Sequence, residues 1–118
     1  MSPSEALSAT IDDLITLIDV TQDFTVFWYQ ESKNLKPDEL KKLLKYEGEN
    51  INLLKRILQW GCDRGDFIID DINLVAHNIM VLCDMWAFRR WALRKDYSLE
   101  QFKQEQKKVI FRIVGIRR

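Results

Sequence analysis

The chain has 118 residues, 47% of them hydrophobic, which is enough for one compact core but short for two. We therefore expect one domain over residues 1–118. Lys plus Arg and Asp plus Glu number 18 each, so the chain lacks the basic excess that binding to a nucleic-acid backbone normally needs.

Membrane insertion and secretion are equally poorly supported. The longest uninterrupted apolar run, residues 79–83, is far below the roughly 20 residues that span a bilayer, and the N-terminus lacks a signal-peptide pattern. Cys62 and Cys83 form no CxxC pair and are expected to be small buried side chains in a reducing compartment. We expect a cytoplasmic protein with no membrane contact.

Apolar residues recur at spacings of three and four throughout, and no segment alternates as a strand would, which predicts an all-α fold of five helices. Ser2 and Glu5 have capping-box spacing, with Pro3 at the first helical position. The first helix therefore begins at Pro3 and ends near Asp19.

A short second helix restarts at Thr21 or Asp23 and ends before Asn34. One of its faces is unusually aromatic and also carries an acid: Phe24, Phe27, Trp28 and Glu31. Glu31 is either an exposed acid at a helix end or a polar anchor in a ligand cavity. The aromatic run 27–29 cannot all point inward from one helix.

Pro37 opens a third helix that continues to a stop at Gly65. At 1.5 Å per residue this helix is about 42 Å long, more than a domain of this size covers uniformly. Gly48 in its middle predicts a bend or a close backbone approach.

The fourth helix, capped by Asp70-Asp71, is expected to extend to Arg94. Between residues 79 and 88 its only charged side chain is Asp84. A helix this apolar must be covered on two sides. We expect one cover from this chain's own helices and the other from a second subunit.

Burying the Asp84 carboxylate without a partner costs free energy, so Asp84 should meet a cation, face a wet cavity or hold a ligand. The cation would be Arg89 or Arg90 in poor register, or one from another helix. His77 shares a helical face with Asp84 and either hydrogen-bonds in the core or lines a pocket. The arginines near residue 90 could bind an anion, although cations are favoured at a helix C-terminus anyway.

The fifth helix begins with a second capping box, Ser98 and Gln101. Its apolar side presents Phe102, Val109, Ile110, Ile113 and Val114. Catalytic constellations are missing: no nucleophile, cofactor motif or metal-spaced set is evident, and an enzyme built around Glu31 and Asp84 is a poor hypothesis. We expect no enzyme activity and no cofactor.

Residues 53–91, followed by residues 97–116, resemble the C-terminal domain of TetR/AcrR-type bacterial transcriptional regulators. A long helix ends in a G-x-x-x-G-x-F turn (Gly61, Gly65 and Phe67), an Asp-capped helix follows, and a final amphipathic helix ends in an apolar-Gly motif. The resemblance extends from about residue 6 to residue 116. The family's N-terminal helix-turn-helix is absent, so we expect these residues alone not to bind an operator.

The resemblance implies that the last two helices pair with their copies in a homodimeric four-helix bundle. Expected interface residues are Val75, Ile79, Leu82, Trp86, Phe102, Val109, Ile110 and Ile113. The earlier helices would enclose a small hydrophobic effector, and the second helix looks most like the fatty-acyl-responsive branch. Expected ligand-binding residues are Phe24, Phe27, Trp28, Glu31, Asn50, Leu54, His77, Met80 and Asp84.

The main alternative is a helical protein–protein interaction module with no small-molecule ligand. An internal cavity of some hundreds of Å³ lined by the expected ligand-binding residues would favour sensing. A solid core would favour the interaction module.

Overall fold

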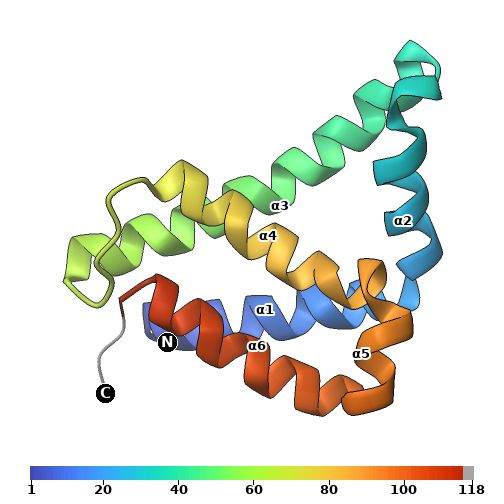
Figure 1. The fold of residues 1–118 in the computed structure, drawn as a ribbon. Coiled ribbons are helices and arrows are strands. Elements are labelled where there is room, and N and C mark those ends of the chain that lie inside the picture. Colours follow the sequence, from blue (N-terminus) through green and yellow to red (C-terminus); the bar gives the residue numbers. More distant parts are fainter. Residues whose placement is uncertain (116–118) are drawn as a thin grey trace.

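The computed structural model describes residues 1–115, which form helices and no strands (Figure 1). The helices are α1 (Pro3–Val20), α2 (Gln22–Glu31), the 3₁₀ turn η1 (Ser32–Asn34), α3 (Pro37–Arg64), α4 (Ile72–Phe88), α5 (Arg90–Asp96) and α6 (Leu99–Ile113). The predicted all-α class is confirmed. None of the described helices combines the length and the apolar character needed to cross a membrane.

Side-chain caps begin three of these helices where the sequence predicts them. The Ser2 hydroxyl accepts the Glu5 N–H at 3.1 Å, and Ser98 accepts the Gln101 N–H at the same distance. Asp71 accepts the Leu74 N–H at 3.0 Å and so caps α4. These bonds satisfy backbone donors that have no partner inside the helix.

The core lies where α1, α3, α4 and α6 pack together. α1 contacts α3, α4 and α6, and α4 contacts α1, α2, α3 and α6. Gln106 on α6 donates to the Leu82 carbonyl of α4 at 2.6 Å, and Lys107 donates to Asp12 of α1 at 3.0 Å. Polar bonds therefore hold α6 to both of its neighbours.

α2, η1 and residues 37–50 of α3 project from this core as an arm (Figure 1). No residue of α2 is buried, and the buried residues of α3 begin at Ile51. The prediction that one domain could not cover the third helix uniformly is thus confirmed. α3 is continuous through Gly48, and no atom lies within 4 Å of the position of an added Cβ there, so Gly48 makes no close approach.

The fourth helix is shorter than predicted, so the described residues form six α-helices instead of five. α4 ends at Phe88, Arg89 leaves helical geometry (φ −105°, ψ 20°), and α5 turns away before α6 returns. The break places Arg90 beside Asp23, with an N–O distance of 2.6 Å. No Gly or Pro marks this position, so only the tertiary contacts explain it.

The turn between α3 and α4 depends on two glycines. Gly65 adopts a left-handed conformation (φ 80°), and the Gly61 carbonyl accepts the Asp66 N–H at 2.8 Å. Phe67 is 3% exposed and packs directly on Gly61, where an added methyl group would overlap its ring.

Gly61→Ala is therefore expected to destabilise the protein by about 3 kcal/mol, because the Phe67 ring must leave its site in the core. Gly48→Ala is the matched control and should stabilise by about 1 kcal/mol, since Ala is the better helix former and space is free. Urea unfolding followed by circular dichroism measures both. Equal effects of the two substitutions would contradict this packing.

Candidate functional site

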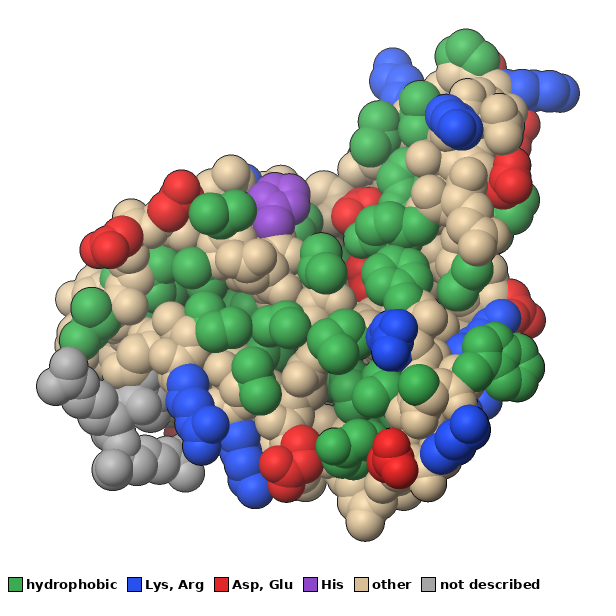
Figure 2. Space-filling view, in the orientation of Figure 1, with side chains coloured by type: hydrophobic (Ala, Val, Ile, Leu, Met, Phe, Trp, Pro, Cys, Tyr) green, Lys and Arg blue, Asp and Glu red, His purple; other side chains and the backbone are tan. Residues whose placement is uncertain are grey.

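A half-open cavity of about 320 Å³ lies where α1, α2, α3 and α4 meet, at the base of the arm. Figure 2 shows a hollow between the arm and the body of the molecule, with acidic atoms visible inside it. The volume suits a small organic molecule. The lining residues are Leu14, Leu17, Ile18, Thr21, Phe24, Thr25, Trp28, Tyr29, Leu43, Tyr46, Glu47, Asn50, Met80 and Asp84.

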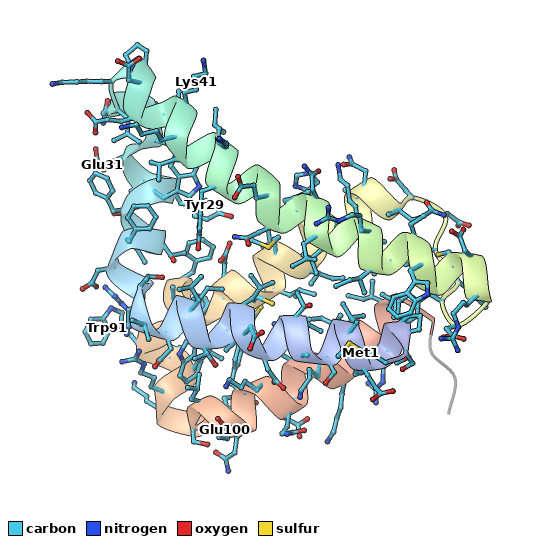
Figure 3. The ribbon with its side chains drawn as sticks, turned by 180° about the vertical axis from the view of Figure 1, so that it is seen from behind. Met1, Tyr29, Glu31, Lys41, Trp91 and Glu100 are labelled. Carbon is cyan, nitrogen blue, oxygen red and sulfur yellow. The ribbon has the colours of Figure 1, made fainter. Side chains whose placement is uncertain are left out.

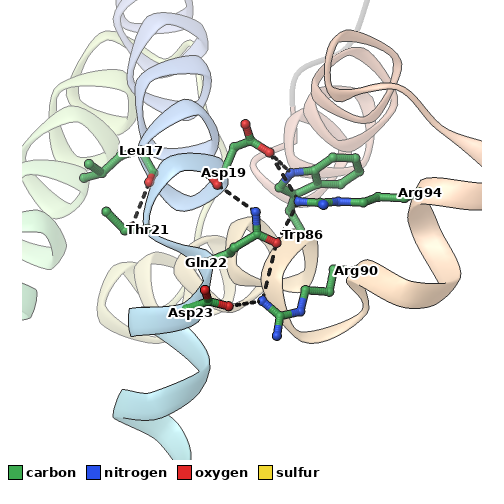
Figure 4. A network of polar contacts seen from close by, with 8 residues as sticks. All are labelled: Leu17, Asp19, Thr21, Gln22, Asp23, Trp86, Arg90 and Arg94. Carbon is green, nitrogen blue, oxygen red and sulfur yellow. Dashed lines mark hydrogen bonds and ion pairs between the residues drawn. The ribbon is translucent and has the colours of Figure 1, made fainter.

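A polar network fixes the base of α2 against the α4–α5 junction (Figure 4). Trp86 Nε1 donates to Asp19 Oδ1 at 2.8 Å, and Gln22 Nε2 donates to the Asp19 carbonyl at 3.0 Å. Arg94 reaches Gln22 Oε1 at 2.7 Å and Arg90 reaches Asp23. These two arginines bond to α2 of the same chain, a role that differs from the expected interaction with a helix C-terminus.

The upper part of α2 is joined to α3 across the cavity. Trp28 Nε1 donates to Glu47 Oε2 at 2.8 Å. α2 packs mainly on α4, with fewer contacts to α1, and its contacts with α3 are sparse. Apart from this hydrogen bond, α2 and α3 are therefore separated, and the space between them forms the cavity.

Asp84 faces this cavity and is only 6% exposed. It accepts a hydrogen bond from the Tyr29 hydroxyl at 2.9 Å, and the Phe88 ring packs edge-on against Tyr29 with centroids 4.5 Å apart. Burial raises the pKa of Asp84 to about 6, the Tyr29 hydrogen bond lowers it in part, and the Glu47 charge raises it further. Of the alternatives for Asp84, pairing with a cation is not supported, whether from Arg89, Arg90 or another helix, since no ion pair among the described residues includes it.

Tyr29 is the functional candidate that sequence reasoning missed. It points to the inner side of α2 (Figure 3), and burial together with the Asp84 charge raises its pKa well above the usual value. A tyrosine hydroxyl near a core needs a partner, and that requirement was the available signal. Burial and Asp84 also raise the pKa of Cys83 to about 12, and Cys83 is buried as predicted, whereas Cys62 is only half-buried.

Five of the nine predicted ligand-binding residues line the cavity: Phe24, Trp28, Asn50, Met80 and Asp84. Their role in binding stays a prediction. The other four lie elsewhere: Phe27, Glu31, Leu54 and His77.

Each of those four positions has a physical reason. Leu54 is fully buried in the core, and Phe27 is 46% exposed and does not line the cavity. Glu31 lies near the tip of the arm and accepts a bond from Asn34 at 2.8 Å (Figure 3). His77 lies on α4 and is exposed at the molecular surface (Figure 2). Helical periodicity groups residues on a face without showing which neighbour the face meets.

Four of the predicted dimer contacts are not supported, because they lie inside the subunit. Ile79 and Ile110 are 0% exposed, and the Trp86 ring packs on Phe102 with centroids 4.9 Å apart. This chain's own helices thus cover more of α4 than predicted. The other four keep surface for a partner: Val75 and Leu82 are half-buried, and Val109 and Ile113 are exposed.

An apolar stripe remains uncovered on α4. Leu74, Val81 and Phe88 are seven residues apart and 56%, 49% and 36% exposed, respectively. Together with Val109 and Ile113 of α6 we call them the α4–α6 face. Figure 2 shows hydrophobic side chains spread over this part of the surface.

A metal site finds no support within residues 1–115, where no group of three or more His, Cys, Asp or Glu side chains could hold an ion. The residues that line the cavity offer hydrogen bonding, charge and apolar contact to a guest molecule. Such contacts can bind and orient a ligand.

These observations define a class of protein: an all-α domain that has a cavity between its helices and exposed apolar side chains on α4 and α6. A family model described as the tetracyclin repressor-like C-terminal domain matches residues 1–91, and the chain belongs to this family. It is therefore a regulatory domain of the general ligand-binding and dimerisation type, and such regulators are generally not enzymes. α6 lies beyond the matched residues. Searches of curated proteins and of solved structures gave no match.

Proposed function

We propose that residues 1–118 act as one effector-sensing and dimerisation domain of a cytoplasmic, TetR-family bacterial regulator. The observation that carries this proposal is the cavity of about 320 Å³ between α1, α2, α3 and α4. Its walls are mainly apolar, with a few convergent polar groups, which is the usual composition of a small-molecule site. Operator contact would come from a helix-turn-helix outside these residues.

The sensing step would act through the arm. α2 contributes Phe24, Trp28 and Tyr29 to the cavity, and its base is tied to the α4–α5 junction by Gln22 and Asp23. A ligand that binds better to one position of α2 would shift the population toward that position. Because α4 carries both Asp84 and part of the α4–α6 face, the same shift would reach a dimer partner.

The second candidate function, a protein-interaction module without a small-molecule ligand, is favoured by the exposed apolar side chains of the α4–α6 face. The cavity supports the sensing function instead. The sensing proposal includes a small hydrophobic effector, and the resemblance to the fatty-acyl-responsive branch suggests an acyl compound as one such effector. An acyl chain would fit the apolar walls only with its anionic group outside, away from Asp84 and Glu47.

A neutral fluorescent probe separates the two functions. N-phenyl-1-naphthylamine should bind once per chain with increased emission, and Thr25→Trp should abolish binding because the new ring fills the cavity that Thr25 lines. Thr16→Trp, an exposed α1 position outside the lining, is the matched control and should bind normally. Naphthylamine binding that Thr25→Trp leaves unchanged would place the probe outside this cavity and would contradict effector sensing there.

A further inference from the structure

The charges around the cavity are one-sided. Asp84 and Glu47 both line it, whereas none of its described lining residues is Lys, Arg or His. Neither acid takes part in an ion pair with any described cation. The two carboxylates act on each other, since the Glu47 charge raises the pKa of Asp84.

The hydrogen bonds within the cavity leave these charges uncompensated. Asp84 accepts from the Tyr29 hydroxyl and Glu47 from the Trp28 indole, both neutral donors. A buried carboxylate without a cation costs free energy that a positively charged guest would recover. An anionic guest would add a third negative charge.

The remaining walls match such a guest. Four aromatic rings line the cavity: Phe24, Trp28, Tyr29 and Tyr46. Aromatic faces attract organic cations also at partly exposed sites such as this one, where Phe24, Tyr29 and Tyr46 keep 46%, 44% and 48% of their surface exposed. Leu14, Ile18 and Met80 supply the apolar surface that a hydrocarbon substituent needs.

Resting on the proposed sensing function, we propose that the effector is a hydrophobic organic cation, an amine or quaternary ammonium, whose positive centre lies between Asp84 and Glu47 among the aromatic rings. The geometry that carries this assignment is the placement of both carboxylates and four rings around one cavity with no basic side chain in its described lining. The hydrocarbon part would lie against α1 and Met80.

Three probes with the same eight-carbon chain test the charge preference by isothermal titration below their micellar ranges. At pH 8 we expect octyltrimethylammonium to bind about 30-fold more tightly than octanoate, with 1-octanol between them. Displacement of N-phenyl-1-naphthylamine by the cation would show that it occupies the same cavity.

Isosteric variants locate the charges. Asp84→Asn and Glu47→Gln should each weaken cation binding about fivefold, and the double variant should bind the cation no more tightly than octanol. Glu49→Gln is the matched control, because Glu49 is an exposed acid on the same helix outside the lining. Equal effects of Glu47→Gln and Glu49→Gln would overturn the assignment to this site.

Lower pH provides an independent readout. Cation affinity should fall about fivefold from pH 8 to pH 5 as Asp84 gains a proton, while octanol affinity stays constant. The ionisable groups facing Asp84 are Tyr29, Glu47 and Cys83, and the pKa values of Tyr29 and Cys83 are raised far above this interval.

The outcomes separate the two proposals. If the naphthylamine probe binds but octanoate or octanol binds at least as tightly as the cation, the cavity senses a ligand of another class and the cation assignment is wrong. If neither the naphthylamine nor any eight-carbon probe binds, the sensing function itself fails.

Discussion

Asp84→Asn is expected to stabilise the protein by about 1 to 2 kcal/mol at pH 8. Burial raises the pKa of Asp84 from 3.8 to about 6, so the charged form is less favourable in the folded chain than in the unfolded chain. Asn keeps an oxygen that can accept the Tyr29 hydroxyl and carries no charge. Part of the gain is offset because the amide N–H groups also need partners.

The sign of the pH dependence follows from the raised pKa. Between pH 4 and pH 6 the folded state holds more protons at Asp84 than the unfolded state, so the contribution of this group to stability falls as pH rises through that interval. Asp84→Asn should remove this slope. Urea unfolding at pH 4.5, 6 and 8 measures it, with Glu49→Gln as an exposed-acid control. A loss of stability in Asp84→Asn at pH 8 would show that the carboxylate is better compensated than its contacts indicate.

Tyr29→Phe provides the opposite test of the same pair. It removes the hydroxyl that donates to Asp84 at 2.9 Å while retaining the ring that packs on Phe88. At pH 8 we expect a loss of about 1 to 3 kcal/mol, because the buried carboxylate then has no protein donor among the described residues. At pH 4.5 the loss should shrink, since a protonated Asp84 depends less on that bond. A loss independent of pH would assign the effect to packing alone.

The second large effect concerns self-association. We expect light scattering at micromolar concentration to give twice the 14.1 kDa mass of the chain, and Val81→Asp combined with Ile113→Asp to give the monomer mass. Both side chains belong to the α4–α6 face and are 49% and 38% exposed, so Asp there would place unpaired charges in a desolvated interface. Circular dichroism should show that the variant remains folded.

Two controls distinguish this face from other surfaces. Leu44→Asp replaces an equally apolar side chain, 55% exposed on the arm, and should leave the dimer intact. Trp86→Ala should lower stability by about 3 kcal/mol, because Trp86 lies in the subunit core at 3% exposure. A monomeric wild-type chain would exclude a dimer of this kind, and dissociation by Leu44→Asp would place the interface on the arm.

Local signals in the sequence were sufficient for the helices and several of their ends. The capping boxes at Ser2 and Ser98 and the left-handed Gly65 are set by neighbouring residues, so they could be predicted without knowledge of the fold. The break at Arg89 has no such signal. The break coincides with hydrogen bonds from Arg90 and Arg94 to residues about 70 positions earlier in the chain.

The candidate cavity was predictable only in part. The sequence marked Asp84 as a costly charge in an apolar helix and α2 as an aromatic segment, and both line the cavity. It gave no sign of Tyr29 or Glu47 as their partners, because the pairs lie 55 and 19 residues apart along the chain. It also placed Ile79, Trp86, Phe102 and Ile110 at a dimer interface, since an apolar helical face looks the same whether its own chain or a partner covers it.

The sequence by itself determined the helical class, the caps, the turn at Gly61 and Gly65, and the presence of one unexplained acid in the fourth helix. Only the tertiary structure decided what that acid meets: a tyrosine hydroxyl and an open space instead of an arginine. The physical reason is the distance along the sequence between the residues that interact. Caps and turns depend on residues within about four positions, whereas the environment of a buried charge is set by which helices pack around it.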